Sequence, residues 1–265
     1  MPTALTIAGS DSGGGAGIQA DLKTFAAHGV YGTSAVTAVT AQNTLGVTAW
    51  EAVSTDLVIA QIEAVAGDIG VDAVKTGMLA TAAIVEAVAA AIDSLELPNV
   101  VVDPVMIAKG GDRLLAEEAV AMVRAELLRR AMVVTPNIPE AEVLADVGIR
   151  SIDDMRSAAR RILALGPRVV VVKGGHLDGD ESVDVVCTAH SAFELRGPRL
   201  PGSNTHGTGC TFAAAVAANL ALGHETEHAL REARAYLEGA IRNAPRIGHG
   251  HGPLNHFWRS HLAQS

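Results

Sequence analysis

The sequence predicts one α/β domain over residues 1–265, a three-layer α/β/α arrangement in which helices cover both faces of a central, mostly parallel sheet. First, strand-like and helix-like runs alternate along almost the whole chain. Second, the runs Val100–Val102 and Val169–Val172 are wholly apolar, as strands buried on both faces should be. Third, aromatic residues make up only 3% of a chain that is 49% hydrophobic, so the core must consist of Ala, Val, Ile and Leu.

The elements of the first half follow from apolar periodicity and from the glycines that interrupt it. Helical spacing predicts helices over residues 19–27, 56–69 and 81–95. Apolar or β-branched runs predict strands over residues 5–8, 35–39, 47–53, 73–75 and 100–102.

The second half repeats this alternation. Helical spacing predicts helices over residues 117–130, 139–146, 153–165, 210–222 and 225–241. Strands are predicted over residues 132–134, 169–172, 183–186 and 192–195, of which the last two form a hairpin or an edge pair. Pro139 lies in the first turn of its helix, where the missing N–H has no partner to lose.

The composition excludes several classes of protein. A net charge of −9 argues against a nucleic-acid surface, which needs clustered Lys and Arg. The two cysteines, Cys187 and Cys210, provide neither a disulfide framework nor zinc-ligand spacing. No uncharged apolar stretch reaches about 18 residues, and the first residues carry no basic leader. We therefore expect a cytoplasmic protein with no nucleic-acid or membrane partner.

Polar and glycine residues come directly after the predicted strands. In parallel sheets, ligands bind beyond the carboxyl ends of the strands, so we expect the functional site at that edge. The segments in question are Gly9-Ser10-Asp11, Gly77-Met78, Asp103-Pro104, Thr135-Pro136-Asn137 and Lys173-Gly174-Gly175.

The strongest local signal is a polar, glycine-rich loop over residues 202–212 that leads into the small-residue run 213–218. Free amides at the start of that helix attract an anion, although a loop that merely turns into a helix is the alternative. The loop has no lysine where a Walker A motif requires one. The glycines of residues 13–17 also fail the dinucleotide pattern, because Ile18 stands where a glycine is needed; they either lie under a ligand or form a flexible turn.

Three charged residues follow strand ends. Glu140, in Asn137-Ile138-Pro139-Glu140, can stabilise a helix dipole or hold Mg²⁺ through water near bound phosphates. For Asp103, which follows the strand over residues 100–102, the same two roles, structural or metal-binding, stay open. Lys173 ends an apolar strand, where a cation is poorly solvated unless it is paired, and a phosphate is a suitable partner.

One apparent zinc motif is rejected. His224-Glu225-Thr226-Glu227-His228 fits the H-E-x-x-H pattern, whose chemistry needs both histidines on one face of a helix. Gly223 ends the preceding helix and Thr226 resembles an N-cap, so the match straddles a helix start. The six histidines from His224 onward are expected on a solvated surface rather than in a metal site.

Together these segments resemble the ribokinase superfamily and, within it, the hydroxymethylpyrimidine/phosphomethylpyrimidine kinases of thiamine biosynthesis. The resemblance runs from Leu5 to about Phe257. Its pieces are Ala8-Gly9-Ser10-Asp11, residues 14–23, Ala41-Gln42-Asn43-Thr44, residues 75–79, Asp103-Pro104-Val105-Met106, residues 135–140, Lys173-Gly174-Gly175-His176 and residues 204–210.

The resemblance implies a ribokinase-like fold and a kinase that uses ATP and Mg²⁺. Such an enzyme phosphorylates the hydroxymethyl group of an aminopyrimidine and then converts the monophosphate to the diphosphate. By the same resemblance, Gln42 would hydrogen-bond the pyrimidine ring, and Gly9, Asp21 and Met78 would line its pocket. Because relatives are often dimers, we expect a homodimer.

The resemblance also implies the residues on the phosphate side. The anion hole for the transferred group would be formed by Gly207, Thr208, Gly209 and Cys210. The remaining assignments are Asn137 and Glu140 for Mg²⁺ and the nucleotide phosphates, Lys173 and Thr205 for the nucleotide, and Asp103 as a further metal-side candidate.

Cys210 stands where most of the superfamily carries an aspartate as general base. A thiol has an unperturbed pKa of about 8.5, which a helix N-terminus lowers. We therefore expect a Cys210 thiolate that helps to deprotonate the hydroxymethyl group in the first transfer only. Cys187 lies in an apolar strand and is expected in the core. The polar, hinge-like segment 106–115 is expected to close over the reacting groups as a lid.

Three other functions stay open. The nearest is a pyridoxal kinase of the same superfamily, because some relatives with the same Gly-Thr-Gly-Cys loop act on pyridoxine-type alcohols. A non-catalytic ligand-binding relative is the second, and the intact Asn137, Glu140 and Lys173 argue against it. A zinc hydrolase is the third, and the position of its apparent motif across a helix start argues against it.

Overall fold

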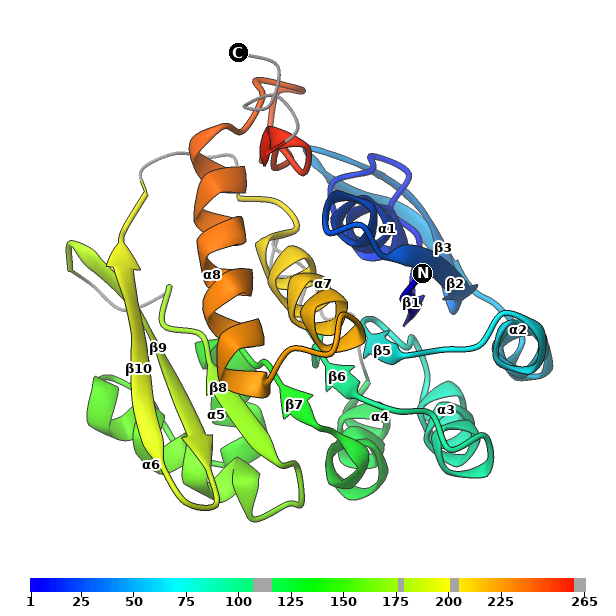
Figure 1. The fold of residues 1–265 in the computed structure, drawn as a ribbon, viewed down its shortest axis with the longest axis horizontal. Coiled ribbons are helices and arrows are strands. Elements are labelled where there is room, and N and C mark those ends of the chain that lie inside the picture. Colours follow the sequence, from blue (N-terminus) through cyan, green and yellow to red (C-terminus); the bar gives the residue numbers. More distant parts are fainter. Residues whose placement is uncertain (107–115, 176–178, 201–204, 260–265) are drawn as a thin grey trace.

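A computed structural model describes residues 1–106, 116–175, 179–200 and 205–259 of the chain. Within these residues an eight-stranded sheet forms the centre of the molecule (Figure 1). Its order is β10 (Ala192–Pro198), β9 (Glu181–Thr188), β8 (Val169–Val172), β7 (Val133–Val134), β6 (Val100–Val102), β5 (Ala73–Thr76), β1 (Thr3–Ala8) and β2 (Tyr31–Val36). The strands from β8 to β2 are parallel, β9 pairs antiparallel with β8, and β10 pairs antiparallel with β9, which confirms the predicted mostly parallel sheet.

Helices cover both faces of this sheet (Figure 1). One face carries α1 (Gly17–Ala27), α7 (Thr208–Ala221) and α8 (Thr226–Arg242). The other carries α2 (Thr55–Asp68), α3 (Ala82–Ser94), α4 (Glu117–Met122), α5 (Ile138–Ala145) and α6 (Ile152–Leu163). Each face has its own aliphatic core, so the three-layer prediction is confirmed. Cys187 is buried in one of these cores, as expected.

Two of the predicted elements change in detail. The predicted strand over residues 35–39 is divided between two strands: β2 ends at Val36, and Thr37, whose N–H still donates to the Ala8 carbonyl at 3.0 Å, separates it from the next strand. The residues after it form β3 (Ala38–Asn43), which pairs only with β4 (Gly46–Ala52). A run of strand-forming side chains does not reveal a change of pairing partner. The predicted helix over 117–130 continues beyond α4 as a π-helical turn (Val123–Leu127) and a 3-10 turn (Leu128–Arg130).

The helix α7 lies deepest against the sheet. Its residues from Thr211 to Leu220 are all buried, and half of them are alanines. Small side chains allow the helix axis to approach the ends of β1, β5 and β6 closely. The N-terminus of α7 is therefore held at the carboxyl edge of the parallel strands. Within the part of the chain that the structure describes, no helix is long and apolar enough to span a membrane.

Candidate active site

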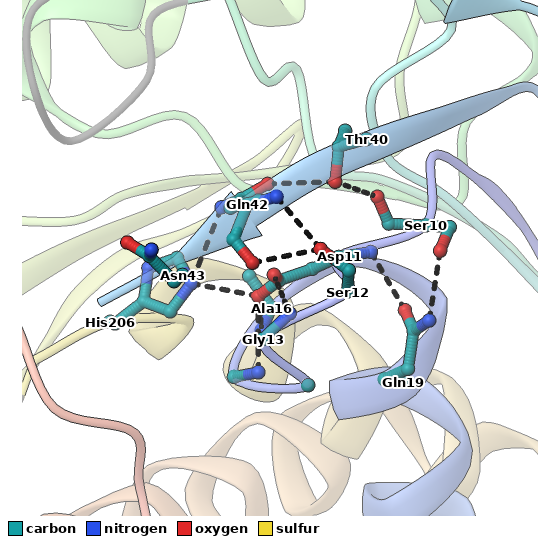
Figure 2. Close-up of polar contacts among 12 residues, drawn as sticks. Ser10, Asp11, Ser12, Gly13, Ala16, Gln19, Thr40, Gln42, Asn43 and His206 are labelled. Carbon is teal, nitrogen blue, oxygen red and sulfur yellow. Dashed lines mark hydrogen bonds and ion pairs between the residues drawn. The ribbon is translucent and has the colours of Figure 1, made fainter. Parts of the chain in front are cut away.

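The loop between β1 and α1 is built around the carboxylate of Asp11, which is only 2% exposed. Its oxygens accept hydrogen bonds from the amides of Gly13 at 2.8 Å, Gly15 at 3.0 Å and Ala16 at 2.8 Å (Figure 2). Gly17 has a φ of 55°, and a Cβ there would collide with the carbonyl oxygen of Gly9. The glycine cluster is thus an ordered turn around one carboxylate.

The same carboxylate reaches the anion loop. The Asp11 Oδ2 lies 2.8 Å from the Nε2 of His206, the residue that precedes Gly207. Burial alone would raise the pKa of Asp11, but His206 and the amides of Ala16 and Gly13 outweigh it and lower the pKa. Asp11 is therefore an ionised hydrogen-bond acceptor that joins two loops far apart in sequence.

The third segment at this point is the β3–β4 hairpin, which carries Gln42. The Thr40 hydroxyl donates to the Ser10 carbonyl at 2.8 Å, and Ser12 Oγ accepts from the Gln42 amide at 2.7 Å. The Gln42 carboxamide lies 3.4 Å from His206 Nε2 (Figure 2). The hairpin is thereby fixed to the loop after β1.

The predicted acceptor residues Gly9 and Met78 lie next to each other. A Cβ on Gly9 would lie 2.7 Å from the Met78 Cε, so glycine makes room for that side chain. The Met78 carbonyl accepts from the Thr37 hydroxyl at 2.6 Å, which places this segment beside the start of β3. The fold therefore brings the ends of β1 and β5 together with the strand that carries Gln42.

Asp21 occupies a different position from the one that a pocket-lining role suggests. It has no exposed surface, and its Oδ2 accepts from Lys75 Nζ at 2.8 Å and from Thr6 Oγ1 at 2.6 Å. Lys75 is equally buried. In the described structure Asp21 therefore contacts Lys75, which lies between it and the site. Direct contact of Asp21 with an acceptor stays a prediction.

Lys75 is the charged residue that the sequence reasoning missed. Burial alone would lower its pKa, but Asp21, Cys210 and Asp103 together raise it, so Lys75 is a cation. Its ammonium lies at the end of β5, where a Cβ on Gly77 would be 2.8 Å away. A lysine that directly follows the apolar pair Ala73-Val74 was the available signal, of the same kind that singled out Lys173.

The predicted anion loop forms the start of α7, where Gly207 is the N-cap with a φ of 80°. A Cβ at Gly207 would collide with the carbonyl oxygen of Gly15, so this loop and the loop after β1 are in direct contact. The N-termini of α1 and α7 consequently converge, and the Gly17 amide hydrogen-bonds the sulfur of Cys210. The first-turn amides of a helix have no intrahelical acceptor, so they favour an anion here.

The thiolate expected at Cys210 is contradicted. Burial raises the pKa of this thiol to about 11; Lys75 opposes that rise, whereas Asp21 and Asp103 add to it. Without ligand, the group is thus a neutral thiol at pH 7. The helix N-terminus was the reason to expect a low pKa, but burial and two neighbouring carboxylates outweigh it.

Lys173 and Asp103 form a pair directly beneath this loop. Lys173 Nζ lies 3.0 Å from Asp103 Oδ1, and a Cβ on Gly209 would be 3.2 Å from that ammonium. Asp103 is 2% exposed and also accepts from the Thr135 hydroxyl at 3.3 Å. Burial opposes the charge of Lys173, yet Asp103 and Glu140 raise its pKa. A cation therefore stands behind the amides that face an anion.

Asn137 and Glu140 form a capping box at the start of α5. Asn137 Oδ1 accepts from the Glu140 amide at 2.9 Å, and Glu140 Oε2 accepts from the Asn137 amide at 2.8 Å. Burial raises the pKa of Glu140 to about 7, with Asp103 adding to the rise and Lys173 opposing it. The helix-stabilising interpretation is therefore confirmed, while a nucleotide or metal role stays a prediction.

Other predicted features lie at the margins of the described structure. Thr205 is partly buried beside His206. Ser203, Asn204, His176 and the predicted lid beyond Met106 lie outside the described residues. His224 precedes α8 and His228 lies within it, so the apparent zinc motif does straddle a helix start, although the cap is Glu225 rather than Thr226. The described residues contain no group of three or more His, Cys, Asp or Glu placed to hold a metal ion.

The tail contributes to the site in a way that the sequence did not suggest. The Thr44 hydroxyl accepts from the amides of His249 and Gly250, and the His206 amide donates to the Gly252 carbonyl at 3.2 Å. This segment therefore joins the β3–β4 hairpin to the anion loop. The expectation of a solvated tail is wrong for His256, which is 2% exposed and lies 3.0 Å from the Thr211 hydroxyl. Burial lowers its pKa to about 4.

Comparison with known sequences gives consistent relatives. The family model for phosphomethylpyrimidine kinase matches residues 11–255. The chain is 49% identical to the hydroxymethylpyrimidine/phosphomethylpyrimidine kinase of Bacillus subtilis, covering 96% of this chain and 94% of that protein. It is 50% identical to a thiamine biosynthesis bifunctional protein of Geobacter sulfurreducens, covering 96% of this chain but only about half, 52%, of that longer protein.

The fold has close structural neighbours. The pyridoxal kinase of Bacillus subtilis in its ADP complex superposes with a TM-score of 0.92 at 42% identity, covering 98% of this chain and 99% of that one. The fold is ribokinase-like, as the resemblance implied. The chain belongs to the phosphomethylpyrimidine kinase family.

Proposed function

We propose that the chain transfers the γ-phosphoryl group of ATP to 4-amino-5-hydroxymethyl-2-methylpyrimidine, and then phosphorylates the monophosphate to the diphosphate in thiamine biosynthesis. The observation that carries the proposal is the convergence of two helix N-termini above Lys173, beside the strand that carries Gln42. An anion site next to a carboxamide suits an acceptor that must be recognised by its ring and phosphorylated on its side group. ADP bound by a structural neighbour supports ATP as co-substrate.

On the phosphate side, catalysis depends on position and charge. Phosphoryl transfer passes through a loose transition state, so the protein mainly has to orient the groups and stabilise charge on the transferred oxygens. The amides of Gly207, Thr208, Gly209 and Cys210 would surround these oxygens, with Lys173 behind them. Asn137 and Thr205 would contact the nucleotide. Since Cys210 is a neutral thiol without ligand, we assign it to this anion hole and no longer to the role of base.

On the acceptor side, Gln42 offers one hydrogen-bond donor and one acceptor to an aminopyrimidine ring, which has the complementary pair. Gly9 and Met78 would contact the ring, because both lie beside the start of β3. The second acceptor is a phosphate oxygen that is already ionised, so that transfer needs no base. One arrangement of charge and amides can therefore support both transfers.

Mg²⁺ fits the carboxylates of Glu140 and Asp103. The described residues provide no three-ligand cage of their own, which suits an ion held mostly by phosphates and water with one or two carboxylates nearby. Glu140 is 4% exposed, so its ionised form needs a neighbouring positive charge. When bound, the ion would neutralise charge that develops on the nucleotide phosphates.

A pyridoxal kinase activity is the second candidate, favoured by the 42% identity to the Bacillus subtilis pyridoxal kinase. Values of kcat/KM for hydroxymethylpyrimidine and for pyridoxal, with ATP and Mg²⁺, decide between the two. Phosphorus NMR of the products should show the pyrimidine monophosphate first and the diphosphate afterwards. A preference for pyridoxal, or no diphosphate after prolonged reaction, contradicts the proposal.

Three further expectations stay predictions. A homodimer is tested by light scattering on the purified chain, and a cytoplasmic location by cell fractionation. Protection of residues 106–115 from proteolysis by substrate plus nucleotide tests the predicted lid.

A further inference from the structure

His206 has a single hydrogen available at Nε2 for two neighbours. That nitrogen lies 2.8 Å from Asp11 Oδ2 and 3.4 Å from the Gln42 carboxamide (Figure 2). An ionised carboxylate only accepts hydrogen bonds, so the hydrogen points to Asp11. A ring nitrogen that bears a hydrogen cannot accept one from an NH₂ group. The Gln42 atom that faces His206 is therefore the carboxamide oxygen.

The neighbour on the other side of Gln42 leads independently to the same orientation. Thr40 Oγ1 lies 2.8 Å from the Ser10 carbonyl oxygen, which only accepts, so the hydroxyl hydrogen is committed there. The hydroxyl oxygen can then only accept from Gln42, whose carboxamide lies 3.2 Å away. The atom that faces Thr40 is therefore the NH₂ nitrogen. A half-turn about the last side-chain torsion exchanges the two carboxamide atoms, and the hydrogen-bond network decides between the orientations.

Asp11 itself is held firmly enough to act as the origin of this chain of hydrogen bonds. Three amides of its own loop bond the carboxylate, and it is almost fully buried. The Gln19 carboxamide supports the loop further by accepting from the Asp11 amide at 2.8 Å and donating to Ser10 Oγ at 2.9 Å. The fixed carboxylate therefore determines that His206 Nε2 bears a hydrogen, and this N–H excludes the NH₂ group of Gln42 from the side that faces His206.

We propose that Asp11 and His206 are positioning residues for the acceptor, which fix the orientation of the Gln42 carboxamide and thereby the ring that it recognises. This inference rests on the proposed function, in which Gln42 binds the acceptor ring. With its oxygen toward His206, Gln42 keeps one lone pair and one N–H for the ring. The ring must also direct its hydroxymethyl group toward the anion loop, which limits how it can turn. If the carboxamide were reversed, its NH₂ group would therefore face a donor group of the ring.

The test is a double-mutant cycle between His206 and Gln42. His206→Leu removes the N–H that excludes the Gln42 NH₂ group, and we expect the KM for the acceptor to rise about tenfold while the KM for ATP changes less than twofold. His206→Gln keeps an N–H near the same point and should stay within about threefold of wild type. In a Gln42→Ala background, His206→Leu should leave the acceptor KM unchanged, because no carboxamide remains to be oriented.

The opposite pattern overturns the inference. If His206→Leu raises the acceptor KM by the same factor with and without Gln42, or raises the KM for ATP as much, then His206 acts on the loops in general. His190→Leu, at the exposed turn between β9 and β10, is the matched control that should change neither constant. If the wild type phosphorylates pyridoxal and not the pyrimidine, the proposed function fails. The cycle is then run with pyridoxal and is scored by the same additivity criterion.

Discussion

The buried carboxyl of Glu140 provides a quantitative test of the site. Its pKa of about 7 compares with an ordinary value of 4.5, a difference of 7 − 4.5 = 2.5. At 1.36 kcal/mol for each pKa unit, this corresponds to about 3 kcal/mol. Because the folded state holds this proton more tightly, the contribution of Glu140 to stability is greatest below pH 4.5 and is lost as the pH rises through 7.

We expect Glu140→Gln to remove this dependence. Glutamine keeps the capping box with Asn137 but has no charge to bury. The variant should therefore match wild type near pH 4.5 and exceed it by about 2–3 kcal/mol at pH 8. The measurement is urea unfolding of both proteins between pH 4.5 and 8, compared through the difference in free energy of unfolding.

Two results would bear against this reasoning. A difference that stays constant over the whole pH range means that Glu140 titrates at its ordinary pKa. A variant less stable than wild type at pH 8 means that Lys173 compensates the buried charge fully. Glu86→Gln, which changes an exposed carboxylate on α3, should give a flat difference and serves as the control.

Two further predictions follow from the buried charges near α7. Lys75→Met leaves the buried Asp21 carboxylate without its cation and should lower the free energy of unfolding in urea by about 3–5 kcal/mol. The double variant Asp21→Leu/Lys75→Met should recover most of this loss. A loss below about 1 kcal/mol in the single variant would show that water reaches the pair. In a Cys187→Ala background without ligand, alkylation of Cys210 by iodoacetamide should still accelerate above pH 9, since the pKa is raised to about 11. If the alkylation rate instead reaches a plateau below pH 8, Cys210 is a thiolate near neutral pH, as the sequence predicted.

The residues after the strands were predictable because parallel strands end at one edge of a sheet. Asp103 and Lys173 illustrate this, since they are 70 residues apart and yet form an ion pair. The residues that follow β1, β5, β6, β7 and β8 meet for the same reason. The convergence of these residues could therefore be predicted without knowledge of the loop structures.

The features that escaped prediction depend on which loops and helices meet. Whether Asp21 faces ligand or core is decided by Lys75, which comes from another strand. The pKa of Cys210 depends on burial and on carboxylates from two other elements, neither of which is visible in the local motif. The contacts of Thr44 and His206 with residues 249–252 join parts of the chain that share no periodicity.

The convergence of α1 and α7 has a thermodynamic consequence. Each helix N-terminus carries about half a positive charge, and two of them lie close together above the partly buried ammonium group of Lys173. The carboxylates of Asp11 and Asp103 offset part of this positive charge, and an anion bound between the helices would offset more of it. By linkage, such a ligand stabilises the folded state by RT ln(1 + [L]/Kd), a term that keeps growing after the site is saturated. We therefore expect the free energy of unfolding to rise with the concentration of a ligand that carries a phosphate group.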